Sequence, residues 1–481
     1  MTATAPQTAF AQALDAYDRG QLEQAAAQFE QLVRQHPAWL DARTNLGTVL
    51  LDLGFAEHAA RTLVEGTQRG PVNATYLSNL LLTLNYLPDL SPDAHFEWHR
   101  RFGQALEPHV PVMAARPRAG GIRRLGLVSG DLRTHPVGRL IEPLLPEWAA
   151  LGVEVVCYSS RAALAGDPLP ARLHARAFAW RDIEPHADGV VAQAIRDDGI
   201  DALIDLSGHT SHNRLGVFAA RPAPLQASWL GYGATTGLTR MDVVLGDDVS
   251  NPPGDDARFV ERLARLPVPR LPLSAPPDTP PPAPPPVVRE GRITFGCFNN
   301  LAKINTAVLS TWARLLHLAP DSRLLLKGRH FNYQRPRVAL IEAFRTLGIS
   351  DERLLFEGFE GKDRYWDSFS RVDIALDPFP FSGGQSTLDA LWMGVPVISL
   401  EAGGMFGRQG AMILRALGLN DWLATDRDAY VSVAARHAAD IDALVALRPR
   451  IRELWAGSAP ANPRAYAEAV LATLDREWQR A

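Results

Sequence analysis

The sequence predicts two α/β lobes preceded by an all-α arm of helical repeats. Three observations predict this class. A spacing of 34 residues recurs in roughly the first hundred positions, apolar strand-like runs alternate with helical stretches from about residue 121, and a proline-rich segment divides that alternating region. With 481 residues, the chain is long enough for about three domains of ~150 residues each.

The repeated part of the chain carries similar residues at positions 34 apart. The matching positions are Gly20 and Gly54, Ala25 and Ala59, Ala26 and Ala60, Phe29 and Leu63, Pro37 and Pro71, Asn45 and Asn79, and Leu46 and Leu80. This is the tetratricopeptide period, with small residues where paired helices touch. We expect units at about 4–37 and 38–71 and a third helix from about 72. Since such stacks usually need at least ~3 repeats, the arm must lean on the α/β region for support. It either caps that region or offers a concave surface to a protein partner.

The α/β region predicts a parallel sheet in each lobe. In the first lobe the strand-like runs are RRLGLVSG, VEVVCYSS, IDALIDLSG, LQASWLG and MDVVLGD; in the second they are RITFGCFNN, SRLLLKG, ERLLFEG, VDIALDPFPF and VPVISL. Strands that alternate with helices form parallel sheets covered on both faces, and ligands bind at the carboxyl ends of the strands. We therefore expect a cleft between the lobes. The predicted parts are a flexible N-terminus at 1–7, repeats and a helical bridge at 8–118, a first lobe at 119–267, a semi-rigid proline-rich linker at 268–291, and a second lobe with a final helix at 292–481.

Composition excludes several classes of protein. The formal net charge of −4 gives no global basic field for nucleic acid or anionic membranes. The two cysteines, Cys157 and Cys297, lie in apolar runs, where we expect buried small side chains instead of disulfide or zinc chemistry. The N-terminus lacks the pattern of a secretory leader, and no run reaches the ~18 apolar residues of a membrane span. These features predict a cytoplasmic protein.

The second lobe contains a predicted anion-binding turn. A strand at 373–377 leads into a glycine-rich turn and then a helix from about Gln385 to Met393. Free backbone N–H groups and the positive end of the helix dipole point out of such a turn, and glycines let an anion approach the backbone. An ordinary strand-to-helix turn is the alternative. The residues predicted to contact a diphosphate here are Gly383, Gly384, Gln385, Ser386 and Thr387.

Three cationic side chains follow other strands of this lobe. Lys303 lies in FNNLAKIN where a strand passes into a helix, Lys362 begins a helix, and Arg408 ends the glycine-rich loop GGMFGR. Each is individually consistent with a surface cation, but one negatively charged nucleotide donor explains them together. There is no Walker or dinucleotide glycine motif and no carboxylate pair spaced for Mg²⁺. Protein cations and helix N-termini must then stabilise a departing diphosphate without a metal.

The first lobe supplies a candidate histidine and an aromatic loop. In SGDLRTHPVGRL, His135 precedes a proline that suits the first turn of a helix. A helix N-terminus lowers an imidazole pKa, and a neutral imidazole can orient or deprotonate an acceptor hydroxyl. A purely structural histidine is the alternative. The residues predicted to shape a sugar or acceptor pocket are Gly208, His209, Trp229, Gly231 and Tyr232.

These segments resemble the O-GlcNAc transferase family, in its short bacterial form. The resemblance rests on GLVSGDLRTHPVGRL, DLSGHTSHNRLGVFAARPAPLQASWLGYGATTG, TFGCFNNLAKIN, VDIALDPFPFSGGQSTLDALWMGVPVISL and GRQGAMILRALGL, which with the repeats cover nearly the whole chain in the family's order. It implies a GT-B-type fold and an inverting, metal-independent glycosyltransferase. It further implies transfer from a nucleotide sugar, UDP-GlcNAc first, to Ser/Thr hydroxyls of protein acceptors, with no cofactor.

The resemblance also implies roles for particular residues. His135 matches the active-site histidine of the family's H-P motif, while Lys303 and Lys362 match lysines that contact the donor. Ser386 and Asp389 match the phosphate-loop and ribose positions.

This chain departs from animal members of the family at several donor-side positions. Gly384-Gln385-Ser386 replaces their H-T-T, and Tyr365 replaces a histidine. Asn300, which we expect to bind the nucleotide sugar beside Lys303, replaces a glutamine. The turn is closer to bacterial relatives and to the plant O-fucosyltransferase branch. GDP-fucose and an activated nonulosonic acid for flagellin are therefore alternative donors.

Two other classes of function are weaker. A non-hydrolysing nucleotide-sugar epimerase would share the two lobes but needs no repeat arm. A catalytically weak repeat scaffold would have no use for His135 and Lys303.

Overall fold

The chain folds into two compact units in the computed structural model. The first comprises Met1–Leu90, Asp278–Gly403 and Gly407–Leu454, and the second comprises Ser91–Pro277, Gly404–Phe406 and Trp455–Ala481. The structure describes every residue except 1–4, 119, 277–278, 360 and 481, and only the backbone of residues 362 and 363. Of the N-terminal residues 1–7, positions 1–4 lie outside the described part and 5–7 begin the first helix.

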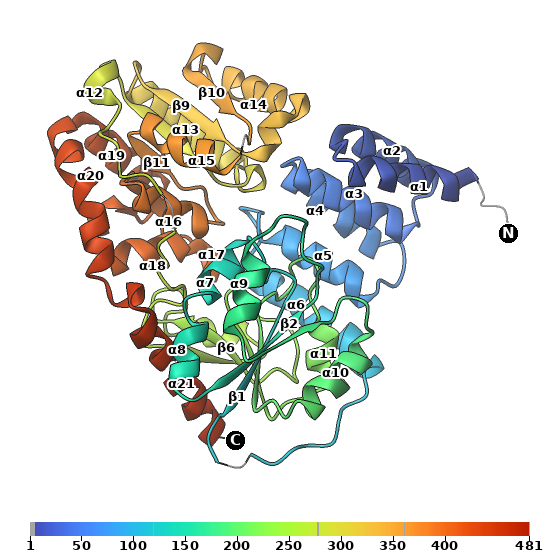
Figure 1. Cartoon of the computed structure of the whole chain (residues 1–481). Coiled ribbons are helices and arrows are strands. Elements are labelled where there is room, and N and C mark those ends of the chain that lie inside the picture. Colours follow the sequence, from blue (N-terminus) through green and yellow to red (C-terminus); the bar gives the residue numbers. More distant parts are fainter. Residues whose placement is uncertain (1–4, 119, 277–278, 360, 481) are drawn as a thin grey trace. The chain divides into compact units, whose positions relative to one another are not determined.

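The first unit begins with the helical arm, drawn in blue in Figure 1. Its helices are α1 (Ala5–Asp18), α2 (Leu22–Gln35), α3 (Leu40–Asp52), α4 (Ala56–Thr67) and α5 (Ala74–Leu84). The starts of α2 and α4, and those of α3 and α5, are 34 residues apart, as the repeat requires. Ala25, Phe29 and Ala59 are fully buried, so the repeated small and apolar positions form the contacts between helices.

The rest of the first unit is a six-stranded parallel sheet in the order β10-β9-β8-β11-β12-β13. The strands are β8 (Thr294–Cys297), β9 (Arg323–Lys327), β10 (Leu354–Glu357), β11 (Ile374–Leu376), β12 (Val397–Leu400) and β13 (Leu423–Ala424). Its helices are α12 (Val287–Glu290), η3 (Leu301–Lys303), α13 (Thr306–Leu318), η4 (Arg329–Asn332), α14 (Gln334–Thr346), η5 (Asp351–Arg353), α15 (Lys362–Ser368), η6 (Phe369–Arg371), α16 (Gln385–Trp392), α18 (Gln409–Ala416), η7 (Asn420–Trp422) and α19 (Arg427–Ala439). Two further helices, α17 (Gly404–Gly407) and α20 (Ile441–Ala456), have residues in both units.

The second unit has a seven-stranded parallel sheet in the order β3-β2-β1-β4-β5-β6-β7. The strands are β1 (Arg124–Ser129), β2 (Glu154–Ser159), β3 (Ala179–Asp182), β4 (Ala202–Asp205), β5 (Leu225–Ser228), β6 (Val243–Asp247) and β7 (Arg262–Leu266). Its helices are α6 (Pro92–Leu106), η1 (Glu107–His109), α7 (Pro136–Ile141), α8 (Leu145–Ala150), α9 (Leu169–Arg176), α10 (Asp188–Asp197), α11 (Leu215–Ala219), η2 (Asp255–Arg258), η8 (Ala459–Ala461) and α21 (Pro463–Gln479).

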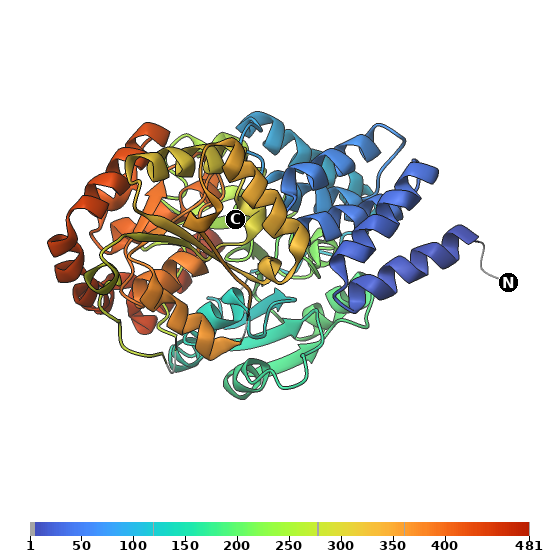
Figure 2. The ribbon, with the colours of Figure 1, turned by 90° about the horizontal axis from the view of Figure 1, so that it is seen from above.

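Both sheets have the same order for their first six strands. The first three strands in the sequence extend the sheet in one direction, and the next three extend it in the other. This is the doubly wound Rossmann order, in which ligands bind where the direction reverses. The reversal falls between β8 and β11 in the first unit and between β1 and β4 in the second. The two Rossmann-like lobes and the helical arm confirm the predicted fold class, and Figure 2 gives a second view of the same elements.

The proline-rich segment 268–291 begins with residues packed into the second unit. Leu271 and Leu273 are buried, as is Arg270, whose guanidinium donates to the carbonyls of Leu230 and Tyr232. The segment ends in α12, whose residues follow the last proline. Within the described part of the chain, every helix is too short or too polar to cross a membrane.

Candidate functional site

The predicted diphosphate-binding turn lies where the sheet of the first unit reverses its order. β8 and β11 are paired there, with Ala375 opposite Gly296. The chain leaves β8 toward Asn299 and leaves β11 toward Asp377, so these two polar residues come off neighbouring strand ends. Asn299 Nδ2 lies 3.4 Å from Asp377 Oδ1 and donates to it. The carboxyl ends of parallel strands thus bring the two motifs together.

Asp377 holds the glycine-rich turn in place. Its carboxylate is 1% exposed and accepts hydrogen bonds from the Gly383 N–H at 2.5 Å and from Ser399 Oγ at 2.8 Å. Burial raises the pKa of Asp377 to about 6, and these hydrogen bonds together with the nearby Lys303 ammonium oppose the rise. The carboxylate is therefore a structural anchor for the loop that precedes α16.

Lys303 ends η3 and points to the same turn. Its Nζ donates to the carbonyl of Ser382 at 2.9 Å and to Asn299 Oδ1 at 3.3 Å. It also lies 4.0 Å from the centroid of the Phe381 ring, in cation–π contact. Burial lowers the pKa of Lys303 to about 8, with Asp377 opposing the shift. The ammonium is thus partly stripped of water and aimed at the turn by three fixed partners.

Asn299 connects the lysine, the carboxylate and the helix. Besides its bonds to Lys303 and Asp377, its Oδ1 accepts from Ser386 Oγ at 2.7 Å, in the first turn of α16. Sequence reasoning chose the adjacent Asn300, whose side chain instead accepts from the Ala302 N–H at 2.9 Å and caps η3. The signal for Asn299 was present, because it comes two residues after the end of a buried strand.

The glycine at position 383 is required by close packing. A Cβ there would lie 2.3 Å from Thr387 Oγ1 and 2.7 Å from Asp377 Oδ1. We expect Gly383→Ala to displace the turn and to weaken nucleoside diphosphate binding by at least about tenfold, equivalent to ~1.4 kcal/mol. Isothermal titration of UDP and GDP measures this, with Gly189→Ala on the exposed side of α10 as a control. Unchanged affinity in Gly383→Ala would show that the turn does not contact the ligand.

The start of α16 has a second polar cluster. Asp389 is 3% exposed and accepts from Gln385 Nε2 at 2.7 Å and from Tyr365 Oη at 2.8 Å. The helix begins after Gly384, as predicted. Tyr365 stands where the resemblance places a donor-side histidine, and here its hydroxyl instead fixes the carboxylate at the predicted ribose position.

The other two predicted cations of this lobe lie at the starts of helices. Lys362 begins α15, but its side chain lies outside the described residues. Arg408 is partly buried and precedes α18. Contact of either side chain with a nucleotide donor stays a prediction.

The lysines of this chain all lie in the second lobe. The chain contains 49 lysines and arginines, and the only lysines are Lys303, Lys327 and Lys362. Lys327, at the end of β9, is buried and forms an ion pair with Glu357 at 3.3 Å. Arginine serves every other Lys/Arg position, and all three lysines fall in one lobe. This distribution was not used in predicting the site.

His135 is the N-cap of α7 in the second unit, as predicted. Its Nδ1 accepts from the Val137 N–H at 3.4 Å and lies 3.6 Å from Asp131 Oδ2. Burial lowers the pKa of His135, and Asp131 opposes this. The groups that lower it further are Arg133, Arg139 and Arg161. Desolvation is thus the largest cause that favours the neutral imidazole, in the direction predicted for a histidine at a helix N-terminus.

Removing Asp131 tests this electrostatic balance. The Asp131 carboxylate favours the imidazolium, so Asp131→Asn should lower the pKa of His135 further. If transfer requires the neutral imidazole, the acid limb of the pH–rate profile moves to lower pH. A profile of kcat/KM from pH 4 to 9 measures the shift, with Asp197→Asn as the control for an exposed carboxylate of the same unit. An acid limb that stays in place or moves to higher pH would contradict the assignment of that limb to His135.

The predicted sugar or acceptor residues lie in two loops of the second unit. His209 (2% exposed), Trp229 (1%) and Tyr232 (1%) are all buried. The Trp229 indole donates to the Arg270 carbonyl, and the ring of Tyr232 packs edge-on to that of His209. Gly208 and Gly231 allow these loops to pack closely. These buried side chains can thus shape a pocket only through the conformation of their loops. Their role in a pocket stays a prediction.

Among the described residues, no three His, Cys, Asp or Glu side chains converge in a way that could hold a metal ion. The acidic residues near the turn are engaged with protein groups: Asp377 with the loop and Asp389 with Gln385 and Tyr365.

The chain is similar to known proteins over most of its length. The probable UDP-N-acetylglucosamine–peptide N-acetylglucosaminyltransferase SPINDLY of Hordeum vulgare is 33% identical over 415 residues, covering 84% of this chain and 43% of the relative. SPINDLY of Oryza sativa subsp. japonica is 34% identical over 415 residues, covering 84% of this chain and 44% of the relative. The chain thus spans less than half the length of these curated relatives.

A solved structure is similar over almost the whole chain. A mutant of the Thermobaculum terrenum O-GlcNAc transferase superposes with a TM-score of 0.93 at 32% identity, covering 99% of this chain and 91% of that one. Residues 109–269 and 287–470 match glycosyl transferase family 41, a span that includes both lobes. The chain therefore belongs to glycosyl transferase family 41.

Proposed function

We propose that this protein is an inverting glycosyltransferase that moves a sugar from a nucleoside diphosphate donor to Ser/Thr hydroxyls of proteins, without a metal ion. The observation that carries the proposal is the Lys303 ammonium, fixed by Ser382 and Asn299 beside the N-terminus of α16. A cation and a helix N-terminus together stabilise an anion in the absence of a divalent ion.

The proposed step is a single displacement at the anomeric carbon. The acceptor hydroxyl oxygen forms the new bond from the face opposite the leaving group, and the bond from the anomeric carbon to the diphosphate oxygen breaks. The electron pair leaves with the diphosphate, where Lys303 and the first N–H groups of α16 stabilise it. The hydroxyl proton passes to a base. His135 is our candidate for a group that binds or accepts this proton, because its imidazole is held neutral.

The donor is proposed from the names of the relatives and from the turn itself. The relatives are named as N-acetylglucosaminyltransferases acting on peptides, which supports UDP-GlcNAc and a protein acceptor. GDP-fucose is a second candidate, because the Gln385 amide binds Asp389 in a turn that departs from the animal pattern. CMP-activated nonulosonic acid is the third, and with this donor the leaving group would be CMP, a monophosphate, in place of a nucleoside diphosphate.

Ligand binding and transfer test this proposal directly. Thermal shifts with UDP, GDP and CMP, each with and without EDTA, identify the nucleotide by mass action. Incubation with host lysate and the matching donor, followed by mass spectrometry, locates modified Ser or Thr. We expect one nucleoside diphosphate to stabilise the protein equally in EDTA, and sugar to appear on hydroxyl side chains. If EDTA abolished binding or transfer and added Mg²⁺ restored it, metal independence would be overturned.

The lowered pKa of Lys303 predicts an alkaline limit to activity. Only the ammonium can stabilise the diphosphate, so kcat/KM should fall as pH rises through about 8. A bound diphosphate favours the ammonium and so raises the pKa of Lys303. The alkaline limb of the kcat profile should therefore lie at higher pH than that of kcat/KM. Initial rates between pH 6 and 11 check both, with protein stability followed in parallel. Coincident limbs in kcat and kcat/KM would show that the group titrating is not in contact with the donor.

A further inference from the structure

The helical arm touches the short segment that carries Lys303. Gly54, in the turn between α3 and α4, has a φ of +89°, and a Cβ on it would come within 2.5 Å of Leu301 Cγ. Ala56 at the start of α4 packs with Ala302, and both are almost fully buried. The backbone of the turn after α3 therefore packs closely against a side chain of η3.

A second contact reaches Lys303 through two aromatic rings. Tyr86, which follows α5, belongs to the same buried cluster as Ala56 and Ala302, and Phe381 packs against it. The rings of Tyr86 and Phe381 are 5.1 Å apart at 30°. The second of these rings faces the Lys303 ammonium, 4.0 Å from the Phe381 centroid. Van der Waals and cation–π contacts thus run without a break from the arm through Tyr86 and Phe381 to Lys303.

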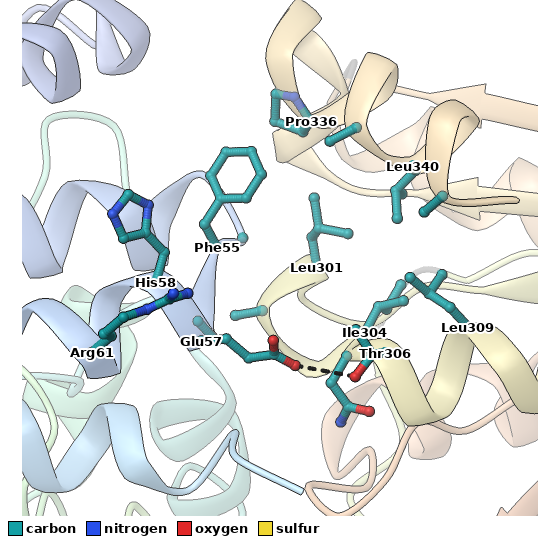
Figure 3. A pocket seen from close by; sticks show the side chains of 16 residues that line it. Phe55, Glu57, His58, Arg61, Leu301, Ile304, Thr306, Leu309, Pro336 and Leu340 are labelled. Carbon is teal, nitrogen blue, oxygen red and sulfur yellow. Dashed lines mark hydrogen bonds between the residues drawn. The ribbon is translucent and has the colours of Figure 1, made fainter. Parts of the chain in front are cut away.

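Beyond this contact the arm and the lobe separate around a pocket. Figure 3 shows Phe55 and Glu57 of the arm facing Leu301, Ile304 and Leu340 across a cavity of about 250 Å³. One long hydrogen bond bridges it, from Thr306 Oγ1 to Glu57 Oε1 at 3.4 Å. The arm therefore acts on η3 through the tight contacts of Gly54, Ala56 and Tyr86, and less through the helices that line the pocket.

Polar contacts also hold the arm against the lobe. Arg329 pairs with Asp52 at 2.7 Å, and the Arg335 N–H donates to Glu23 Oε1 at 2.7 Å. Tyr333 Oη donates to the Gly20 carbonyl at 3.0 Å. These contacts join the turn between α1 and α2, the start of α2 and the end of α3 to η4 and the start of α14.

We infer that the repeat arm is a structural part of the donor site, with Tyr86 acting as a positioning residue that holds Phe381 against Lys303. The inference rests on the proposed role of Lys303 and extends it to a segment otherwise expected to serve protein acceptors. Phe381 lies in a loop and is only partly buried, so a ring behind it is needed to keep its face toward the ammonium. Tyr86 supplies that ring and excludes water from the same side.

The chain's three lysines make a direct test practical. Protein grown with lysine labelled at Cε with ¹³C gives one signal each for Lys303, Lys327 and Lys362, assigned with single Lys→Arg variants. The Cε shift of Lys303 is then titrated without ligand in wild type, Tyr86→Phe, Tyr86→Ala and Phe381→Leu. The charged or titratable groups near Lys303 are Asp377 and Cys297, and those near Tyr86 are Asp52 and Arg329.

We expect Tyr86→Ala and Phe381→Leu to raise the pKa of Lys303 from about 8 toward its ordinary value, because water reaches the ammonium. Both should weaken binding of the nucleotide that the wild type takes, UDP or GDP, several-fold, while Tyr86→Phe retains wild-type values. The Lys327 signal should not move. Phe381→Leu leaves the arm intact, so it decides the question if Tyr86→Ala does not fold.

The inference is overturned if Lys303 titrates identically in wild type and in the folded variants. It is also overturned if Tyr86→Phe behaves like Tyr86→Ala, since the ring would then not be the active feature. A wild type that binds no nucleoside diphosphate and transfers no sugar would instead overturn the proposed function. The titration without ligand still answers whether Tyr86 positions Lys303, so the two failures are distinguishable.

Discussion

Replacing Lys303 by methionine is expected to reduce sugar transfer about a thousandfold or more while leaving the protein folded. Methionine keeps the length and apolar stem of the side chain but removes the charge that stabilises the leaving diphosphate. The bonds to Ser382 and Asn299 are also lost. Because a hydrogen bond to a charged group is worth ~1.5–3 kcal/mol, nucleoside diphosphate affinity should fall about tenfold to a hundredfold. Initial rates and isothermal titration measure the two effects separately.

Two substitutions control for charge and for lysine chemistry in general. Lys303→Arg keeps the charge, but a planar guanidinium does not fit the compact site between the Ser382 carbonyl and the Phe381 ring, so transfer should remain strongly impaired. Lys327→Arg changes a buried lysine of the same lobe whose partner is Glu357, and it should keep near-wild-type transfer. If Lys303→Met transferred sugar at more than about a tenth of the wild-type rate, the diphosphate would have to be stabilised elsewhere.

The positions of the main strands could be predicted from the sequence because their apolar runs are buried on both faces. β1, β2 and β8 each follow the predicted run closely. Three strands escaped prediction for physical reasons. β3 lies at a sheet edge and is half exposed, β7 lies at the other edge with arginines at its first and fourth positions, and β13 is two residues long. An edge strand or a very short strand has no continuous apolar signal.

The candidate site was predictable where local geometry determines it. A strand followed by two glycines and a helix places Gly383 and Ser386 without knowledge of the rest of the fold. The partners of Lys303 were not predictable in the same way. Asn299 and Asp377 are 78 positions apart in the sequence, and they meet only because β8 and β11 are neighbours at the reversal of strand order.

The aromatic loop of the second unit shows what a motif leaves undecided. Trp229 and Tyr232 lie in the loop predicted to shape a sugar or acceptor pocket, and that role stays a prediction. The polar atoms of both side chains are bound within the unit: the Trp229 indole donates to the Arg270 carbonyl, and the Tyr232 hydroxyl lies 2.9 Å from His99 Nε2. Large aromatic side chains fill cores as readily as pockets, and only the tertiary partners distinguish the two cases.

The arm illustrates why the role of a repeat cannot be derived from its period. The spacing of 34 residues predicted the helices, and the buried alanines explain their packing. The period does not indicate that Tyr86 lies against Phe381, since that contact joins residues nearly three hundred positions apart. A short stack of helices must bury its last apolar face on something, and here the partner is the segment beside Lys303.

Substituting His135 by asparagine should reduce transfer by about a hundredfold to ten-thousandfold, the range for loss of a group that moves a proton. Asparagine is among the best N-cap residues, so its side-chain oxygen can replace Nδ1 as the acceptor of the Val137 N–H and α7 should keep its start. Nucleoside diphosphate affinity should stay near that of the wild type, because the Lys303 cluster is unchanged.

Three measurements separate a chemical role of His135 from a structural one. Thermal unfolding should give a similar Tm for His135→Asn and wild type, while His135→Ala should be less stable by ~1 kcal/mol through loss of the cap. Both variants should lose transfer to a similar extent, and the acid limb of the pH–rate profile should disappear with the imidazole. If His135→Asn were active and only His135→Ala were impaired, the capping hydrogen bond would explain the effect, and the proton would have to leave the acceptor hydroxyl by another group.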